Sequence, residues 1–154
     1  MADEDQLKII HSGVDKWNQW RADNPDVQIE LSGAILPPML YLIKVNLSHA
    51  TLMDANLVNG ILMDAAFNDA NLYNANLNHA VLNYANLSGA NLSGANLSGA
   101  SLHGATLTNA NLSGANLSGA DLSGADLNGV DPTNACLGGA ILQGATMPDG
   151  TIHP

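Results

Sequence analysis

Aliphatic residues recur every five positions along most of this chain. From Leu47 to Met147 there are 21 such positions without an insertion, and 18 of them hold leucine. The position two residues earlier is nearly as uniform, with 18 alanines. We call these the leucine and alanine positions. The residue between them is the outward position, and the residue two after the leucine is the corner position.

A period of five fits neither an α-helix nor a straight strand. On a helix each residue turns about 100°, so leucines five apart would spiral around the cylinder. On a straight strand an odd step alternates between faces, so half of the leucines would point into water. A short extended segment followed by a bend fits, because the alanine and leucine positions then face one side. The sequence therefore predicts an all-β solenoid.

The corner positions support a bend in every pentad. Their 21 occupants are ten Gly, four Asn, four Asp, two His and one Tyr. Glycine, asparagine, aspartate and histidine are the types that most readily accept positive φ. We therefore expect left-handed backbone at each corner, with Tyr84 as the one residue that does not fit this preference.

The pattern also divides the chain into parts. Upstream of Leu47 the spacing continues one residue out of register, so a single extra residue lies within 37–45. We predict an N-terminal cap at 1–28, a repeat at 29–150 that is regular from about 45, and a C-terminal tail at 151–154.

The tandem A(N/D)LSG units resemble the pentapeptide-repeat proteins over about residues 29–150. The resemblance implies a right-handed quadrilateral parallel β-helix with four pentads per coil. The 21 pentads then make about five coils, with leucine filling the axis and alanine the corners.

The N-terminal cap is predicted to contain one amphipathic helix over residues 4–22. Asp3 or Asp5 can cap its start, and the Asn-Pro at 24–25 ends it. The segment WNQWR at 17–21 resembles the N-terminal helix of some cyanobacterial members of the family. The helix either covers the first coil or binds a partner. Its apolar stripe follows helical spacing: Leu7, Ile10, Val14 and Trp17.

At the other end, Pro148 and the Asp149-Gly150 pair predict a turn that closes the last coil.

Charge excludes some classes of partner. The net charge is −10, and all four basic residues precede residue 45, after which there are seven acids and no base. Nucleic acids and anionic membrane surfaces need a positive face, so neither is expected as a partner. The acidic start lacks the apolar segment of a secretory signal, which favours a cytoplasmic protein.

No catalytic constellation is evident, so the sequence predicts no enzyme activity, cofactor, metal or small-molecule substrate. His49 and Asp69 stack in the coil arrangement, but positive φ already explains both. Cys136 takes an outward position, where an inert exposed thiol is expected. The evenly spaced glycines are not followed by a lysine, unlike those of a phosphate-binding loop.

One group of residues departs from the polar exterior of the repeat. Ile61 and Val81 are expected to stack on one face near Met63, with Met53 on Tyr73 two faces away. Clustered exposed apolar groups usually mark a contact. Either the out-of-register segment or the N-terminal helix covers them, or they form a surface for a partner or a second copy. The group is Met53, Val58, Ile61, Met63, Tyr73, Val81 and Tyr84.

The acidic surface is scattered. Duplex DNA carries about 15 charges over a rod of about 25 Å, and the seven acids supply less than half of that. Asparagine is the usual outward residue, and stacked asparagines can exchange hydrogen bonds along the coil axis. The asparagine columns are 56/76/96/116 and 71/91/111. The acids that could face a partner are Asp54, Asp64, Asp69, Asp121, Asp126 and Asp131.

The sequence therefore favours a non-enzymatic structural or interaction module that binds a protein, as a monomer or weak homodimer. The resemblance adds two alternatives. One is an acidic DNA mimic acting on DNA gyrase, and the other is a regulator of cyanobacterial cell differentiation.

Overall fold

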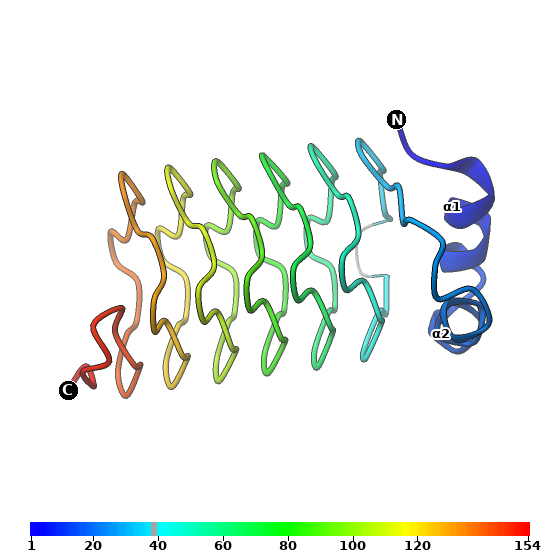
Figure 1. Ribbon diagram of the computed structural model, residues 1–154. Coiled ribbons are helices and arrows are strands. Elements are labelled where there is room, and N and C mark those ends of the chain that lie inside the picture. Colours follow the sequence, from blue (N-terminus) through cyan, green and yellow to red (C-terminus); the bar gives the residue numbers. More distant parts are fainter. Residues whose placement is uncertain (38–39) are drawn as a thin grey trace.

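A computed structural model of the chain describes residues 1–37 and 40–154. Two helices, α1 (Glu4–His11) and α2 (Val14–Asp23), lie at one end of a solenoid whose coils stack along a single axis. The chain runs along this axis, so the two termini lie at opposite ends (Figure 1).

Each coil is made of four pentads and is held to the next by parallel bridges between outward positions. One such series runs from Asn46 through Ala66 and Asn86 to Thr146, and each side of the coil carries six stacked outward positions. The leucine N–H donates to the carbonyl of an outward residue in the following coil, as from Leu87 to Thr106 at 2.7 Å. Over the described residues the bridges are isolated, so each predicted short strand is reduced to a single bridging position.

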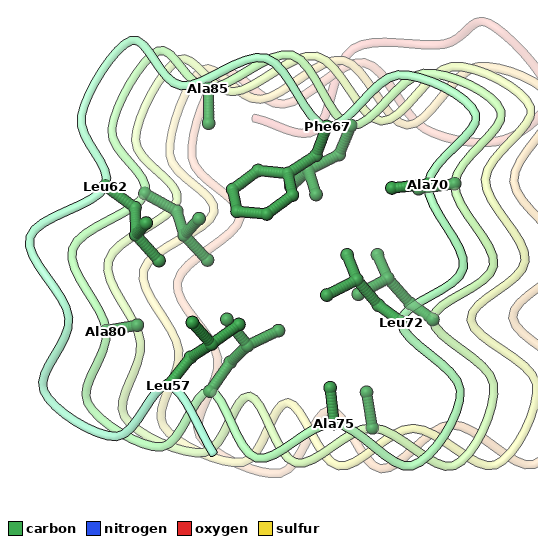
Figure 2. Packing of buried hydrophobic residues seen from close by; sticks show 14 of the residues in the cluster. Leu57, Leu62, Phe67, Ala70, Leu72, Ala75, Ala80 and Ala85 are labelled. Carbon is green, nitrogen blue, oxygen red and sulfur yellow. The ribbon is translucent and has the colours of Figure 1, made fainter. Parts of the chain in front are cut away.

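The leucine and alanine positions form one continuous core, as predicted. From Leu47 to Leu127 every leucine-position residue is at most 5 % exposed. Figure 2 shows both kinds of side chain pointing into the interior from successive sides of a four-sided coil. Phe67 fits a leucine position without exposure. The labelled residues are Leu57, Leu62, Phe67, Ala70, Leu72, Ala75, Ala80 and Ala85.

The corners adopt the predicted left-handed backbone. Twenty of the 21 corner positions have φ between +54° and +72°, including Tyr84 at +60°. Asp149 is the exception, and there the neighbouring Gly150 has positive φ instead. A bend of fixed hand in every pentad is what returns the chain to the same side after four pentads.

Several corner side chains lie over the corner of the following coil. A Cβ added at Gly89 would collide with the Asp69 Oδ1 atom, and one at Gly104 would come within 2.6 Å of the Tyr84 ring. These two glycines are therefore required for space as well as for their positive φ.

The outward asparagines and aspartates stabilise the bend that follows them. Asn91 Oδ1 accepts hydrogen bonds from the Ser93 N–H at 3.2 Å and the Ser93 hydroxyl at 2.7 Å. This local pattern recurs along the repeat and explains the preference for Asn or Asp before leucine and Ser after it. The predicted asparagine ladder forms in part, with bonds from Asn91 to Asn71 and from Asn96 to Asn76 in the described residues.

The change of register lies where the sequence places it. Ile35 bridges Asn56, whereas Tyr41 bridges Ile61, so the first pair is one position further apart in the sequence than the second. The extra residue therefore lies between 35 and 41. Pro38 and Met39, which belong to the predicted segment, lie outside the described residues.

The N-terminal cap differs from the prediction, because the single helix expected over 4–22 is two helices. The helix is interrupted at Ser12 and Gly13, because Gly13 has a φ of +113°, which an α-helix cannot contain. Asp3 caps α1 by accepting from the N–H groups of Asp5 and Gln6. Ile10 and Trp17 are fully buried against the end of the leucine core.

Two carboxamide side chains satisfy the backbone edge of the first coil on two of its four sides. Gln6 donates to the Gln28 carbonyl at 3.0 Å and accepts from the Glu30 N–H at 2.8 Å. Asn18 bonds in the same way to the Lys44 carbonyl and the Asn46 N–H. Each amide thus replaces the peptide group of a missing coil, which protects an edge that would otherwise template aggregation.

The C-terminal tail does not close the last coil, contrary to the prediction. After the turn at Pro148–Gly150 the chain reverses, and Ile152 forms an antiparallel bridge with Thr146. The tail therefore adds to one side of the coil and leaves the interior open, with Leu137 36 % exposed. The turn itself is formed as expected.

We predict that Asn18→Asp destabilises the protein by about 1–3 kcal/mol, because a carboxylate cannot donate to the Lys44 carbonyl. The free energy of unfolding in urea measures this. Lys16→Gln, on the exposed side of α2, changes the net charge by the same amount and is expected to have little effect. Equal losses in the two variants would show that charge, rather than the edge contact, is responsible.

Candidate functional site

The side of the solenoid that carries Ile61 differs from the other three. Its six outward positions are Tyr41, Ile61, Val81, Ser101, Asp121 and Ile141, joined by successive parallel bridges. We call it the 41–141 face. It is apolar near the N-terminal end and polar from Ser101 to Asp121.

The first three coils of this face gather six apolar side chains. Ile61 bridges both Tyr41 and Val81, and the Lys44 N–H donates to the Met63 carbonyl, which sets Ile43 beside Met63. The group is half-buried to exposed, with Tyr41 67 % and Tyr84 56 % exposed. It consists of Tyr41, Ile43, Ile61, Met63, Val81 and Tyr84.

The remaining predicted surface residues lie elsewhere. Met53 and Tyr73 belong to successive coils on the opposite side, where the Asp54 N–H donates to the Tyr73 carbonyl. Val58 lies on the side between and is partly buried. The structure thus unites four of the seven predicted residues and separates the other three.

The out-of-register segment does not cover this group in the described residues, contrary to one of the two readings of the sequence. Tyr41 and Ile43 instead form the preceding coil of the same face. The helices lie over the end of the solenoid, where they contact residues 28–30 and 44–48. Tyr41 and Ile43 lie four pentads before Ile61 and Met63 in the sequence, and this spacing could have identified them.

The polar half of the face contains a hydrogen-bonded series that the sequence did not reveal. The Ser123 hydroxyl donates to Asp121 Oδ1 at 2.6 Å and lies 2.8 Å from His103 Nδ1. His103 therefore donates from Nδ1, which leaves Nε2 directed away from the pair. The His103 ring also meets Tyr84 edge-on, with ring centroids 5.5 Å apart.

This series stabilises charge at Asp121. The Ser123 hydroxyl, and then the Ser123 backbone N–H, hold the pKa of Asp121 below its usual value, and His103 adds a smaller effect. The order of contacts is carboxylate, hydroxyl, imidazole. A catalytic triad instead needs the carboxylate on the imidazole and the hydroxyl free to lose its proton to it.

The acidic residues occupy two kinds of position. Asp54, Asp64 and Asp69 are exposed corner residues. Asp121, Asp126 and Asp131 are outward residues on three successive sides of one coil, each accepting from the residue two later. His49 Nδ1 lies 3.8 Å from Asp69 Oδ2, and both side chains are more than half exposed, so the pair adds little stability.

The described residues contain no group of three or more His, Cys, Asp or Glu side chains placed to hold a metal ion. None of their helices is long and apolar enough to cross a membrane. Cys136 is exposed, as its outward position predicts.

Comparisons with known proteins identify relatives of this repeat. The family model for pentapeptide repeats matches residues 61–99, 95–131 and 110–147. Among solved structures the chain is similar to HetL, a pentapeptide repeat protein involved in heterocyst differentiation regulation from the cyanobacterium Nostoc sp. strain PCC 7120. The identity is 39 % and the TM-score 0.56, over 82 % of this chain and 63 % of HetL.

Two further structures are similar. Rfr23, a pentapeptide repeat protein from the cyanobacterium Cyanothece 51142, is 32 % identical with a TM-score of 0.52, over 80 % of this chain and 92 % of Rfr23. QnrB1, a plasmid-mediated fluoroquinolone resistance protein, is 21 % identical with a TM-score of 0.58, over 77 % of this chain and 69 % of QnrB1, and that likeness concerns the fold alone. A search of curated proteins found no match.

We predict that Ser123→Ala raises the pKa of Asp121 toward its usual value of 3.8, because the largest cause of the lowering is removed. A lowered pKa stabilises the fold above the unfolded value, and this contribution is lost as the pH falls through the folded value. The decline of stability as the pH falls below the usual aspartate value of 3.8 should therefore be shallower in the variant. Carboxyl titration by NMR and urea unfolding measure the two effects.

Ser118→Ala is the matched control, because Ser118 follows the neutral Asn116 on the neighbouring side. An unchanged pKa of Asp121 in Ser123→Ala would contradict the conclusion that Ser123 lowers it.

Proposed function

Because this chain belongs to the pentapeptide repeat family, we propose that it is a non-enzymatic module that binds a protein through the 41–141 face. The observation that carries the proposal is the gathering of six apolar side chains on one side of a repeat whose exterior is otherwise mostly Asn, Ser and Thr. Exposed apolar patches of this kind mark interaction sites in soluble proteins.

The composition of the patch suits protein recognition. Two tyrosines, Tyr41 and Tyr84, flank the aliphatic Ile61 and Val81, and tyrosine is among the residues that contribute most to binding energy at interfaces. The stacked arrangement is held by the backbone, because Ile61 and Val81 bridge the coils before and after them and Tyr41 bridges the coil that follows it. A rigid surface loses little conformational entropy on binding.

Charge defines the kind of partner further. Asp64 and Asp121 lie on the same face, and Lys44 is the one basic residue of the repeat. With a net charge of −10, the protein attracts partners that present basic residues around an apolar centre.

A non-enzymatic role is supported by the geometry of the polar half. His103 and Ser123 are arranged with the hydroxyl already donated to Asp121, so Ser123 is not poised as a nucleophile.

A regulatory role is the second candidate, and the likeness to HetL favours it. HetL is involved in the regulation of heterocyst differentiation, and it is 39 % identical to this chain, which spans 63 % of its length. Such a role would also act through protein contacts. The gyrase-directed DNA mimic is less favoured, because seven acids beyond residue 45 fall well below the charge of a DNA rod.

We predict that Ile61→Asp combined with Val81→Asp weakens partner binding at least tenfold, because both carboxylates would be desolvated at the centre of the contact. Affinity capture from a native lysate, followed by titration of the captured protein, measures the loss. Ala66→Asp with Asn86→Asp places the same two charges in the same two coils on the adjacent side, and it should bind normally. Recovery of the same partners by both double variants would exclude the 41–141 face as the site.

A further inference from the structure

The C-terminal end of the leucine core contains an open apolar pocket. Its cavity volume is about 200 Å³, its floor is the leucines of the preceding coil, and its wall is the last coil, with no polar surface in the lining. We call it the terminal pocket. Its wall consists of Val130, Pro132, Ala135, Leu137, Leu142, Met147 and Pro148.

The opposite end of the same core shows what such an end requires. There Ile10 and Trp17 fill the interior with no exposure, and the amides of Gln6 and Asn18 satisfy the backbone edge on two of the four sides. Among residues 1–37 and 40–154, none fills the core at the C-terminal end, and none bonds to its edge over residues 135–142. An apolar side chain and hydrogen-bonding groups are therefore the chemistry that this end lacks.

The rim of the terminal pocket is a row of unpaired backbone groups. In the preceding coil the Leu117 and Leu122 N–H groups donate to the carbonyls of Cys136 and Ile141. Among the described residues, no backbone carbonyl accepts from the N–H groups of Leu137 and Leu142, and no backbone N–H donates to the carbonyls of Ala135 and Ala140. The edge over residues 135–142 is thus free on two adjacent sides.

The tail shows that this edge accepts an added strand. On the next side of the coil His153 donates to the Ala145 carbonyl at 2.8 Å, and the Gly144 N–H donates to the His153 carbonyl at 2.9 Å. The bond from His153 to Ala145, together with the one from the Met147 N–H to the Thr151 carbonyl at 2.7 Å, forms the antiparallel bridge of Ile152 with Thr146. On the side before residues 135–142 the leucine position holds Pro132, which has no N–H to offer. An added strand can therefore bond along residues 135–142, between Pro132 on one side and the tail on the other.

Two negative charges beside the free edge favour a bound segment with basic residues on both flanks. The exposed carboxylates of Asp131 and Asp149 lie before and after the free edge. Hydrogen bonds from the Thr133 and Thr151 hydroxyls lower the pKa of Asp131 and Asp149 respectively, so both are charged at neutral pH.

We propose that the edge over residues 135–142 and the terminal pocket bind an extended peptide segment of another protein. The segment adds as a further strand, inserts a leucine-sized or phenylalanine-sized side chain into the pocket, and carries basic residues on its flanks. A dry apolar cavity of about 150 Å³ suffices to hold a benzene molecule, so 200 Å³ accommodates such a side chain. Strand addition to an exposed edge is an established mode of peptide recognition.

The probe is a synthetic peptide in which two leucines alternate with threonines between Lys-Lys flanks. The control peptide has the same composition with the two leucines adjacent, so that one of them must face water. Binding is measured by calorimetry, and the amides of Leu137 and Leu142 are followed by NMR hydrogen exchange. We expect the alternating peptide to bind at least tenfold more tightly and to slow exchange at both amides.

Two variants test the pocket and the edge. Ala135→Phe fills the pocket, whereas Leu137→Pro removes one free N–H, in the way Pro132 does on the preceding side, together with part of the pocket wall. Each is expected to weaken peptide binding at least tenfold. The Ile61→Asp/Val81→Asp variant should bind the peptide normally, so this inference can fail independently of the proposed function.

Three results would overturn the inference. The Leu137 and Leu142 amides could exchange as slowly in the free protein as those of Leu97 and Leu102, which would mean that the edge is already covered. The two peptides could bind equally well. Sedimentation could also reveal a dimer that Ala135→Phe dissociates, in which case the occupant is a second copy of this chain.

Discussion

The left-handed residue at each corner is the constraint on which the rest of this structure depends. One such bend in every pentad returns the chain to the same side after four pentads, and the bridges between coils then fall between equivalent outward positions. The core follows from this closure, because leucines four pentads apart stack along one axis. The surface follows as well, since any outward side chain has its neighbours at the equivalent positions of the coils before and after it. Stability in such a molecule is a sum of contacts between successive coils.

The two ends of the solenoid differ in how their exposed backbone edges are covered. At the N-terminal end the side-chain amides of Gln6 and Asn18 cover the backbone edge on two sides, and Trp17 adds a bond from its Nε1 to the Asn46 carbonyl. At the C-terminal end the tail covers one side alone, and Pro132 removes a donor from another. The N-terminal end thus has a filled core and an edge bonded at Glu30 and Asn46, whereas the C-terminal end has an open core and a free edge over residues 135–142. Binding at the 41–141 face and binding at the C-terminal end, which we propose, would therefore be separable.

Much of the fold could be predicted from the sequence, because the pentad pattern is local and repeated. The inward leucines and alanines, the positive φ of the corners and the shift of register between 35 and 41 all follow from spacing. The single helix over 4–22 was wrong, because a stripe of apolar residues can continue across a break, and Gly13 was not given enough weight. The tail was misjudged because turn chemistry at Pro148–Gly150 predicts a reversal but not the side of the coil to which the chain returns.

The candidate site was predicted less completely, because it depends on neighbours distant in sequence. Ile61, Met63 and Val81 were found from the stacking of every fourth pentad, whereas Tyr41 and Ile43 were missed because the whole segment 37–45 was treated as out of register, although Tyr41 keeps the regular step to Ile61. The contact of His103 with Ser123 follows the same stacking rule, but the rotation of the imidazole toward the hydroxyl is set by side-chain geometry that spacing does not encode.

The placement of corner side chains over the next coil has a consequence for how this sequence can change. The Asp69 carboxylate occupies the space where Gly89 would carry a Cβ, and the Tyr84 ring does so at Gly104. A larger residue at either glycine is accommodated only after its neighbour one coil earlier has been shortened or redirected. Among homologues, such pairs should mutate in concert, and copying one coil onto another would succeed only where the two sets of corner residues are sterically compatible.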